Sequence, residues 1–243
     1  MVKLSKLIIT EILAHAEHVY PYEACGLIIQ NGRKQRYVRC RNQALEPEEH
    51  FTMSPEDYAE AEDSGAIVAI VHSHPDATTQ PSHVDQAECD VSQLPWVIAS
   101  WPEGDIRTIM PAEGVKPLLG RPFVHGIWDC YTIVRDWYLL ERSITLPNFE
   151  RADGWWNRSE NLYMKHYAEA GFTAVSGELQ PGDVIIMQVR ANEPNHAGIY
   201  VGNGEMLHHM YNQLSQKVPY GGYWLDRTIT RLRYTGGANA GSH

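Results

Sequence analysis

The feature that most constrains the fold is a segment at residues 111–122 that holds three prolines and two glycines and shows little hydrophobic periodicity. Such a segment continues neither a helix nor a strand, so it divides the chain. Residues 1–113 carry 8 Lys and Arg against 18 Asp and Glu, whereas residues 114–243 carry 12 of each. We therefore predict a domain at residues 1–113, a linker at 114–122 and a second domain at 123–243.

The composition excludes several classes of protein. Hydrophobic residues make up 43% and charged residues 21% of the 243 positions, as in soluble globular proteins. No apolar run approaches the roughly 18–20 residues of a membrane span, and the first residues lack a signal-peptide pattern, so we expect no membrane span and synthesis in a cytoplasm. The net charge of −10 argues against a nucleic-acid partner. The four cysteines form no C-x-x-C pair, and we expect free thiols.

The first half alternates helix and strand signals. The pattern predicts helices over 7–16 and 54–65 and from residue 82, with strands over 25–30, 36–41, 67–71, 96–101 and 105–110. Asn31 and Gly32 form a tight-turn pair between the first two strands. Alternation of this kind predicts a layered α/β domain.

The second half has a different order. Asp129 and Cys130 precede an amphipathic segment that extends to Leu140, and a second helix is predicted over 159–170. Strands are then predicted over 184–189, 197–201 and 205–210. Helices followed by a small antiparallel sheet predict an α+β domain.

Residues 72–85, which read HSHPDATTQPSHVD, contain a candidate metal site. His72 and His74 are two residues apart at the end of a predicted strand, so their imidazoles emerge on one face. Asp85 follows Ser82 by three residues at a predicted helix start. Two imidazoles and one carboxylate leave one position of a tetrahedral zinc open, which is the arrangement of catalytic zinc sites.

Taken separately, both patterns have ordinary explanations. About 0.6 chance H-x-H pairs are expected in a chain with this many histidines, and S-x-x-D is commonly a helix capping box. Both patterns at this offset are expected by chance in roughly one or two chains per thousand, so the metal site is the better explanation.

H-x-H followed by seven residues, Ser, two residues and Asp resembles the signature of the JAMM/MPN metalloproteases. The resemblance implies one Zn²⁺ held by His72, His74 and Asp85. It also implies that Glu23, which follows the first helix, is the general base that activates water, and that Ser82 stabilises the oxyanion. Outside this context Glu23 would be a solvated surface acid. His83 matches no ligand position and is expected at the surface.

A candidate thiol site lies in the second half. Cys130 stands at a predicted helix N-terminus, which favours the thiolate. The turn at residues 202–204 brings His196 and His208 close across two strands. Cys130 as nucleophile, His196 as base and His208 as the group that orients the base follow the logic of a catalytic triad. Each residue by itself is more often structural: a packed thiol or a strand histidine.

The order Asp-Cys, Pro-Gly-Asp, His-x-Gly-Ile-Tyr-x-Gly-Asn-Gly and apolar-His resembles the NlpC family of papain-like cell-wall peptidases, which cut peptidoglycan stem peptides. The family's usual Asp-Cys-Ser-Gly is Asp-Cys-Tyr-Thr here, at residues 129–132, and this departure affects the pocket beside the nucleophile. His209 is expected on the opposite strand face, so His208 is the preferred third residue.

A JAMM/MPN domain followed by an NlpC-type domain, with Gly-Gly-Tyr-Trp at residues 221–224, is similar to the tail-tip proteins of lambda-like phages. The resemblance implies a hydrolase with two sites, whose partners are peptidoglycan stem peptides and other tail-tip proteins. It also implies a location in the host cytoplasm during assembly or in the virion tail tip. A structural or chaperone-like tail component and a bacterial cell-wall recycling peptidase are the alternatives that the sequence leaves open.

Overall fold

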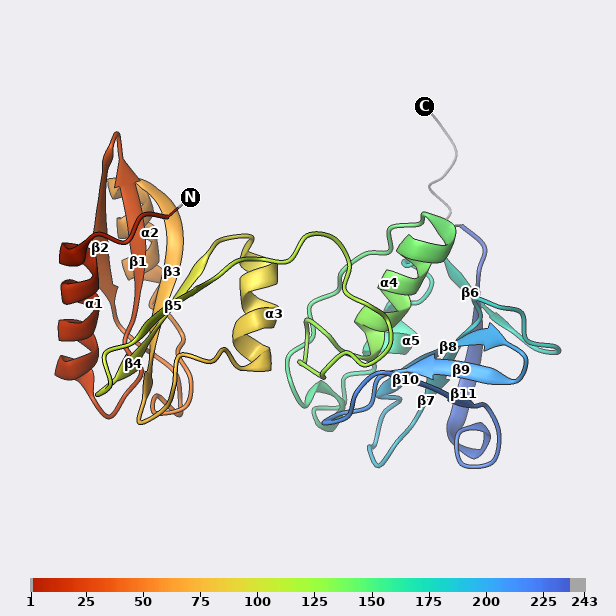
Figure 1. Cartoon of the computed structure of the whole chain (residues 1–243). Helices are drawn as coiled ribbons and strands as arrows, with labels where there is room; N and C mark the ends of the chain where they lie inside the picture. The colour runs from red at the N-terminus through yellow and green to blue at the C-terminus, as the bar shows by residue number, and fades with distance from the viewer. Residues whose placement is uncertain (1, 237–243) are drawn as a thin grey trace. The chain divides into compact units, whose positions relative to one another are not determined.

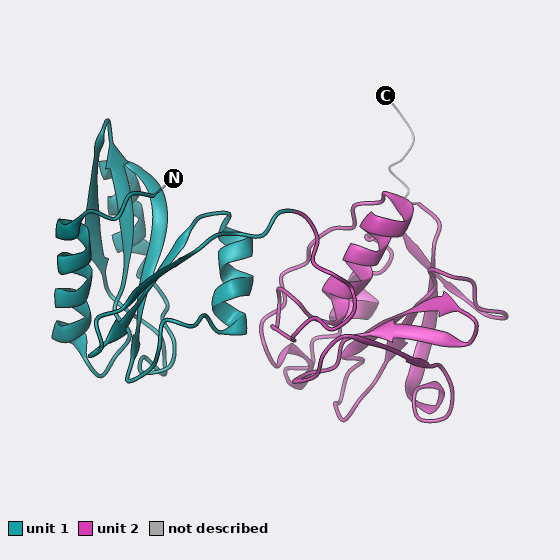
Figure 2. Ribbon diagram, viewed as in Figure 1, with its two compact units in different colours: residues 1–113 teal, residues 114–243 magenta. Residues whose placement is uncertain are grey.

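A computed structural model describes residues 2–236 of the chain, which divides into two compact units, residues 1–113 and residues 114–243 (Figures 1 and 2). Within the described residues, no helix has both the length and the hydropathy needed to cross a membrane. The cysteines are all free thiols.

Unit 1, residues 1–113, is built on a mixed sheet of five strands with the order β2-β1-β3-β4-β5. The strands are β1 (Cys25–Asn31), β2 (Lys34–Cys40), β3 (Ala66–Pro75), β4 (Trp96–Trp101) and β5 (Ile106–Ile109). Only β3 and β4 run parallel, with α3 (His83–Ser92) in the connection between them. The predicted Asn-Gly turn joins β1 to β2, with Gly32 at φ +61°.

Helices cover both faces of this sheet (Figure 1). Helix α1 (Lys6–Val19) packs Ile8 and Ile12 on one face, against residues that include Val71 and Val97. Helix α2 (Pro55–Ser64) packs Ala61 on the other face, against Leu27 and Ile29 among others. Two covered faces explain why the central strands are nearly continuous runs of apolar residues. The predicted α/β class is confirmed for this unit.

Unit 2, residues 114–243, contains an antiparallel sheet of six strands with the order β10-β9-β8-β7-β11-β6 among the described residues. The strands are β6 (Phe172–Val175), β7 (Val184–Met187), β8 (His196–Gly202), β9 (Glu205–His208), β10 (Gln216–Pro219) and β11 (Thr228–Tyr234). The helical segments are α4 (Cys130–Arg142), η1 (Trp155–Asn157), α5 (Leu162–His166) and η2 (Leu225–Arg227).

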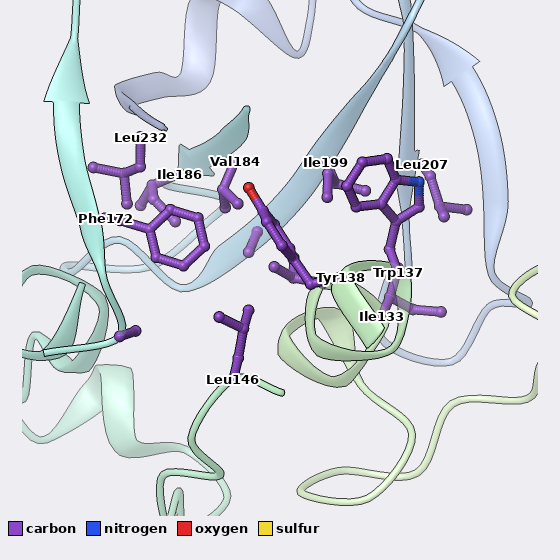
Figure 3. Close-up of a cluster of buried hydrophobic side chains, with 13 residues drawn as sticks. Ile133, Trp137, Tyr138, Leu146, Phe172, Val184, Ile186, Ile199, Leu207 and Leu232 are labelled. Atoms are coloured by element: carbon purple, nitrogen blue, oxygen red, sulfur yellow. The ribbon is translucent and has the colours of Figure 1, made fainter. Parts of the chain in front are cut away.

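Helix α4 lies against the sheet over the main core of unit 2 (Figure 3). Ile133, Trp137 and Tyr138 of α4 pack on strand residues that include Ile199 and Leu207. Burial of each such side chain contributes about 1.5–3 kcal/mol. This packing fixes the first turn of α4, and therefore Cys130, relative to β8.

Three details differ from the sequence-based expectations. The helix predicted over 159–170 is shorter and forms only α5. It begins after Asn161, whose side chain accepts a 3.2 Å hydrogen bond from the Met164 amide, and it ends at His166. Strands β6, β10 and β11 were not predicted. Within the segment 114–122, Arg121 is buried in unit 2, where its guanidinium contacts Asp136 and its amide bonds Ser215 Oγ at 2.8 Å.

Candidate active sites

In unit 1, the two histidines of the H-x-H pattern lie on β3, which extends through Pro75. His72 pairs with Ile98 and His74 with Ser100 of the parallel neighbour β4, so both side chains share one face of the sheet. The His72 ring stacks on Phe51 with centroids 5.0 Å apart. Nδ1 of His74 lies 2.8 Å from the Thr78 carbonyl, to which it donates. Each ring therefore presents Nε2 toward the same point.

Asp85 is held at that point by the first turn of α3. Ser82 is the N-cap: its Oγ accepts from the Asp85 amide at 3.0 Å, and its own amide donates to Asp85 Oδ2 at 2.7 Å. Asp85 Oδ1 lies 3.2 Å from His72 Nε2, and Oδ2 lies 3.4 Å from His74 Nε2. The capping box and the candidate ligand are thus the same residues.

These three side chains fit a metal ion. The two Nε2 atoms are 3.0 Å apart, and each lies within 3.4 Å of an Asp85 oxygen. Bond lengths of about 2.0–2.2 Å to a tetrahedral zinc place ligand atoms roughly 3.3–3.5 Å from one another, close to the observed spacings. Burial lowers the pKa of His72 and so keeps its imidazole neutral, which is the form that binds metals.

Glu23 lies beside this group. It follows α1 and lies two residues before the start of β1, and together with His74, Ser82 and Asp85 it lines a cleft of about 750 Å³. Its side chain is buried, and burial raises its pKa to about 7, with His74 opposing and Asp85 adding to the shift. A carboxyl group of this pKa both accepts and returns a proton near neutral pH. His83 is exposed, as expected.

In unit 2, Cys130 is the first residue of α4, and Asp129 is its N-cap. Oδ1 of Asp129 accepts from the amides of Tyr131 and Thr132 at 3.1 and 2.9 Å. Arg151 neutralises the buried carboxylate, with Nε 2.6 Å from Oδ2. The same guanidinium donates five further hydrogen bonds, to Asp129 Oδ1, Thr132 Oγ1, Asn148 Oδ1 and the carbonyls of Gly126 and Phe149. The Gly126 amide donates to Asp129 Oδ2.

The two expected histidines meet across neighbouring strands. His196 is the first residue of β8, and His208 is the last residue of β9, opposite Gly198. Nε2 of His196 lies 3.0 Å from Nδ1 of His208, which leaves His196 Nδ1 as the ring nitrogen for a nucleophile. A Cβ on Gly198 would lie 2.3 Å from Sδ of the buried Met206, so a larger residue at this position would require the Met206 side chain to move.

Cys130 and His196 line one cavity of about 230 Å³. Aromatic side chains form much of its wall: Phe123, Trp155, Trp156, Tyr163 and Tyr211. Trp224, the last residue of the Gly-Gly-Tyr-Trp sequence, packs on His208 with ring centroids 4.5 Å apart and on His196 at 5.9 Å. The Gly-Gly-Tyr-Trp motif is visible in the sequence, but the packing of Trp224 on the two histidines depends on the tertiary structure.

Electrostatics at the thiol differ from the expectation. Burial, followed by the charge of Asp129, raises the pKa of Cys130 to about 11. Burial, followed by the neighbouring histidines, lowers the pKa of His196 to about 3, and burial lowers that of His208 to about 4. The expected thiolate-favouring effect of the helix N-terminus is therefore outweighed by desolvation, and the Cys130 thiol and the His196 imidazole are both neutral at pH 7.

His209 corrects a second expectation. Strand β9 ends at His208, so alternation of side chains does not extend to His209, which is fully buried and lines the Cys130 cavity. Its Nε2–H donates to the Gln213 carbonyl at 3.1 Å. Two residues that no sequence motif indicates, Arg151 and Tyr163, also line this cavity. Both come from the segment between α4 and β6; Arg151 contacts Asp129, and Tyr163 contacts the Cys130 sulfur.

Two family models match the chain, one for each unit. Residues 5–112 match the model described as prokaryotic homologs of the JAB domain, and residues 120–233 match the NlpC/P60 family. Among solved structures, a JAB1/MPN domain protein from Archaeoglobus fulgidus is 18% identical and covers 45% of this chain and 89% of its own, with a TM-score of 0.30. The family assignment of each unit follows from the sequence matches.

Two curated relatives extend across both units. The tail tip assembly protein K of Escherichia phage N15 is 52% identical over 228 residues, which are 93% of this chain and 93% of the relative. The protein of the same name from Escherichia phage lambda is 42% identical over 183 residues, 75% of this chain and 89% of the relative. The chain therefore belongs to the tail tip assembly protein K family, with a JAB/MPN-like domain followed by an NlpC/P60 domain.

Proposed function

We propose that the protein acts in phage tail-tip assembly and that its Cys130 site hydrolyses the stem peptides of peptidoglycan. The observation that carries this proposal is the arrangement of Cys130, His196 and His208. Cys130 and His196 line one cavity, and Nε2 of His196 lies 3.0 Å from Nδ1 of His208. The family match supports a peptidase of the NlpC/P60 type.

The proposed reaction starts from the neutral pair. As the Cys130 sulfur bonds to the scissile carbonyl carbon, the thiol proton passes to His196. His208 holds the imidazole through Nε2 and fixes its orientation. The proton then moves from His196 to the leaving amine as the C–N bond breaks, which leaves a thioester on Cys130. Water, deprotonated by His196, hydrolyses the thioester and restores the thiol.

Digestion of peptidoglycan and of isolated stem peptides by the purified protein tests this proposal, with mass spectrometry of the products. We expect cleavage by the parent and by Cys89→Ser, whose thiol is buried on α3 in unit 1, and none by Cys130→Ser. Cleavage by Cys130→Ser at the parental rate would remove the thiol-peptidase assignment and favour a structural or chaperone-like tail component.

We also propose that unit 1 is a zinc-dependent peptidase or isopeptidase. The observation behind this proposal is the convergence of His72, His74 and Asp85 beside Glu23 in one cleft. A zinc ion bound there supplies a Lewis acid and lowers the pKa of water. Glu23 takes the proton from water and delivers it to the leaving amine. The Ser82 hydroxyl, whose oxygen accepts from the Asp85 amide, has its proton free to donate to the oxyanion.

Metal analysis of the purified protein tests the zinc site without a substrate. We expect about one zinc per chain in the parent and in His83→Ala, which alters an exposed histidine of the same motif. The double variant His72→Ala/His74→Ala is expected to contain none. Stoichiometric zinc in that double variant would show that these residues are not the ligands.

The proposed partners are other tail-tip proteins and peptidoglycan, and the proposed location is the host cytoplasm during assembly or the virion tail tip. The shared name of the two relatives supports this role. Mass spectrometry of purified virions distinguishes a virion component, whose peptides are expected in stoichiometric amounts, from an assembly factor or a bacterial cell-wall recycling enzyme, which is absent from the particle.

A further inference from the structure

Tyr163 contacts the proposed nucleophile of unit 2. Its hydroxyl oxygen lies 3.2 Å from Cys130 Sγ. The residue belongs to α5, 33 positions after the cysteine, in a segment that the sequence analysis expected only to be helical. This is the one side-chain hydrogen bond of the Cys130 sulfur within residues 2–236.

The ring of Tyr163 is held firmly in this position. Trp155 packs against it with centroids 5.8 Å apart, and Tyr131 does so at 6.4 Å. The turn that carries it is fixed at its start, where Asn161 caps the Met164 amide and donates to Glu193 Oε2 at 2.9 Å. The hydroxyl therefore reaches the sulfur without needing to move.

The other groups that face Cys130 cannot take this role. The Arg151 guanidinium is committed to Asp129, to Thr132 and to carbonyl groups. Asp129 is an acceptor whose charge opposes ionisation of the thiol. His196 must receive the thiol proton. The Ala197 backbone amide also faces the sulfur, which leaves Tyr163 as the available side-chain donor.

We propose that Tyr163 is a catalytic group of the thiol site, whose hydroxyl donates a hydrogen bond to the Cys130 sulfur and stabilises the thiolate that forms when His196 takes the proton. A hydrogen bond to a charged acceptor strengthens as the charge develops, so it favours the reactive state over the resting thiol. Burial keeps the phenol protonated, because it raises the pKa of Tyr163 well above its usual value.

This inference rests on the proposed nucleophile but not on the proposed substrate, because thiolate formation is measurable by alkylation. Tyr163→Phe removes one oxygen and keeps the ring. We expect Cys130 in this variant to react about tenfold more slowly than in the parent at each pH between 7 and 9, because hydrogen bonds to charged groups are worth about one to two powers of ten. Peptide mass mapping separates Cys130 from the other three cysteines.

Two reagents of different size, iodoacetamide and a bulky maleimide, separate electrostatics from access. Loss of the hydrogen bond slows both by the same factor, whereas a change in access affects the larger reagent more. Tyr167→Phe is the matched control, because Tyr167 lines the same apolar cavity as Tyr163. This variant is expected to leave the alkylation rates of Cys130 with both reagents unchanged. Tyr163→Met, which also lacks the hydroxyl but has a different shape, is expected to slow both reagents as Tyr163→Phe does.

An unchanged or faster reaction of Cys130 in Tyr163→Phe, with the parental circular dichroism spectrum, would show that Tyr163 only covers the thiol. If alkylation slows as expected but neither parent nor variant cleaves stem peptides, the role of Tyr163 stands and the proposed substrate fails. If stem peptides are cleaved, we also expect Tyr163→Phe to lower kcat at least tenfold.

Discussion

At the scale of single residues, the thiol site depends on charge compensation beside Cys130. Asp129 caps α4 and is almost completely buried, and Arg151 supplies the only positive charge that contacts it among the described residues. The carboxylate thus serves the helix without placing an uncompensated negative charge next to the nucleophile. Coulombic attraction and hydrogen bonding to Arg151 hold the pKa of Asp129 below its usual value against the opposing effect of burial.

We expect Arg151→Gln to lower the free energy of unfolding of unit 2 by about 3–5 kcal/mol, because it leaves a buried carboxylate without its partner. Urea unfolding followed by the methyl signals of Ile133 and Ile199 measures the change. Arg41→Gln, which removes the ion pair of the exposed Arg41 side chain with Asp57 in unit 1, is the comparison. Its unfolding is followed by the methyl signals of Ile8 and Ile12 of unit 1, and it is expected to cost far less. Equal losses in the two variants would show that burial does not determine the value of the Arg151 pair.

At the scale of elements, one capping motif occurs twice in unit 1 with different consequences. Ser54 begins α2 and accepts from the Asp57 amide at 3.4 Å, and Ser82 begins α3 and accepts from the Asp85 amide at 3.0 Å. Only at Ser82 is the bond reciprocated, because the Ser82 amide donates to Asp85 Oδ2, and Asp85 is also a candidate metal ligand. The Asp57 carboxylate instead accepts from Arg41. The helix start and the candidate metal site therefore share Asp85.

We expect Ser82→Ala and Ser54→Ala each to destabilise unit 1 by about 1 kcal/mol, the usual value of an N-cap. Only Ser82→Ala is expected to weaken zinc binding, by several-fold, because Asp85 loses the hydroxyl that fixes its amide and with it part of its orientation. Competition with a chelator measures zinc affinity, and urea unfolding measures stability. Weaker zinc binding in Ser54→Ala as well would indicate a general loss of structure.

At the scale of the whole molecule, unit 2 encloses three histidines whose pKa values burial lowers: His196 to about 3 and His208 and His209 to about 4. In the unfolded chain each titrates near 6.5. At a pH between the folded and the unfolded pKa values, the unfolded state binds more protons than the folded state. The free energy of unfolding therefore rises with pH in this range and decreases as the pH falls below about 6.5.

We therefore expect the free energy of unfolding of unit 2 to decrease between pH 7 and pH 5, with each histidine contributing a slope of at most about 1.4 kcal/mol per pH unit. Urea titrations followed by the methyl signals of Ile185 and Ile199 report on this unit. His209→Gln removes one of the three groups and should make the dependence less steep. A dependence as steep in this variant as in the parent would exclude His209 as a contributor.

The division of the chain leads to a second prediction at this scale. Glu113 and Gly114 are exposed at the junction of the units, whereas Arg121 is packed into unit 2. We expect brief digestion with a Glu-specific protease to cut after Glu113 and to yield two folded fragments, because few contacts cross such a junction. Glu113→Gln should suppress this cleavage. Resistance of the parent at Glu113, together with one cooperative unfolding transition, would indicate a single fused unit.

The sequence by itself determined the features that depend on neighbours along the chain. The Asn31–Gly32 turn, the capping of α3 and the apolar run of β3 follow from local propensity and from periodicity, and they place the motif histidines on a strand and Asp85 on a helix start. The convergence of His72, His74 and Asp85 could be predicted because their spacing is compatible with one strand and the first turn of one helix. The pairing of His196 with His208 could be predicted because a tight turn sets the register of a hairpin.

Only the tertiary structure decided what depends on burial and on contacts between distant segments. Tyr163 contacts Cys130 from 33 residues away, and Arg151 contacts Asp129 from 22 residues away, so no local pattern indicates either contact. The pKa of Cys130 is raised although its helix position favours the thiolate, because desolvation depends on the surrounding side chains. Helices and strands depend mainly on residues that are close in sequence. The desolvation of a site depends on all the side chains packed around it, including those from distant segments.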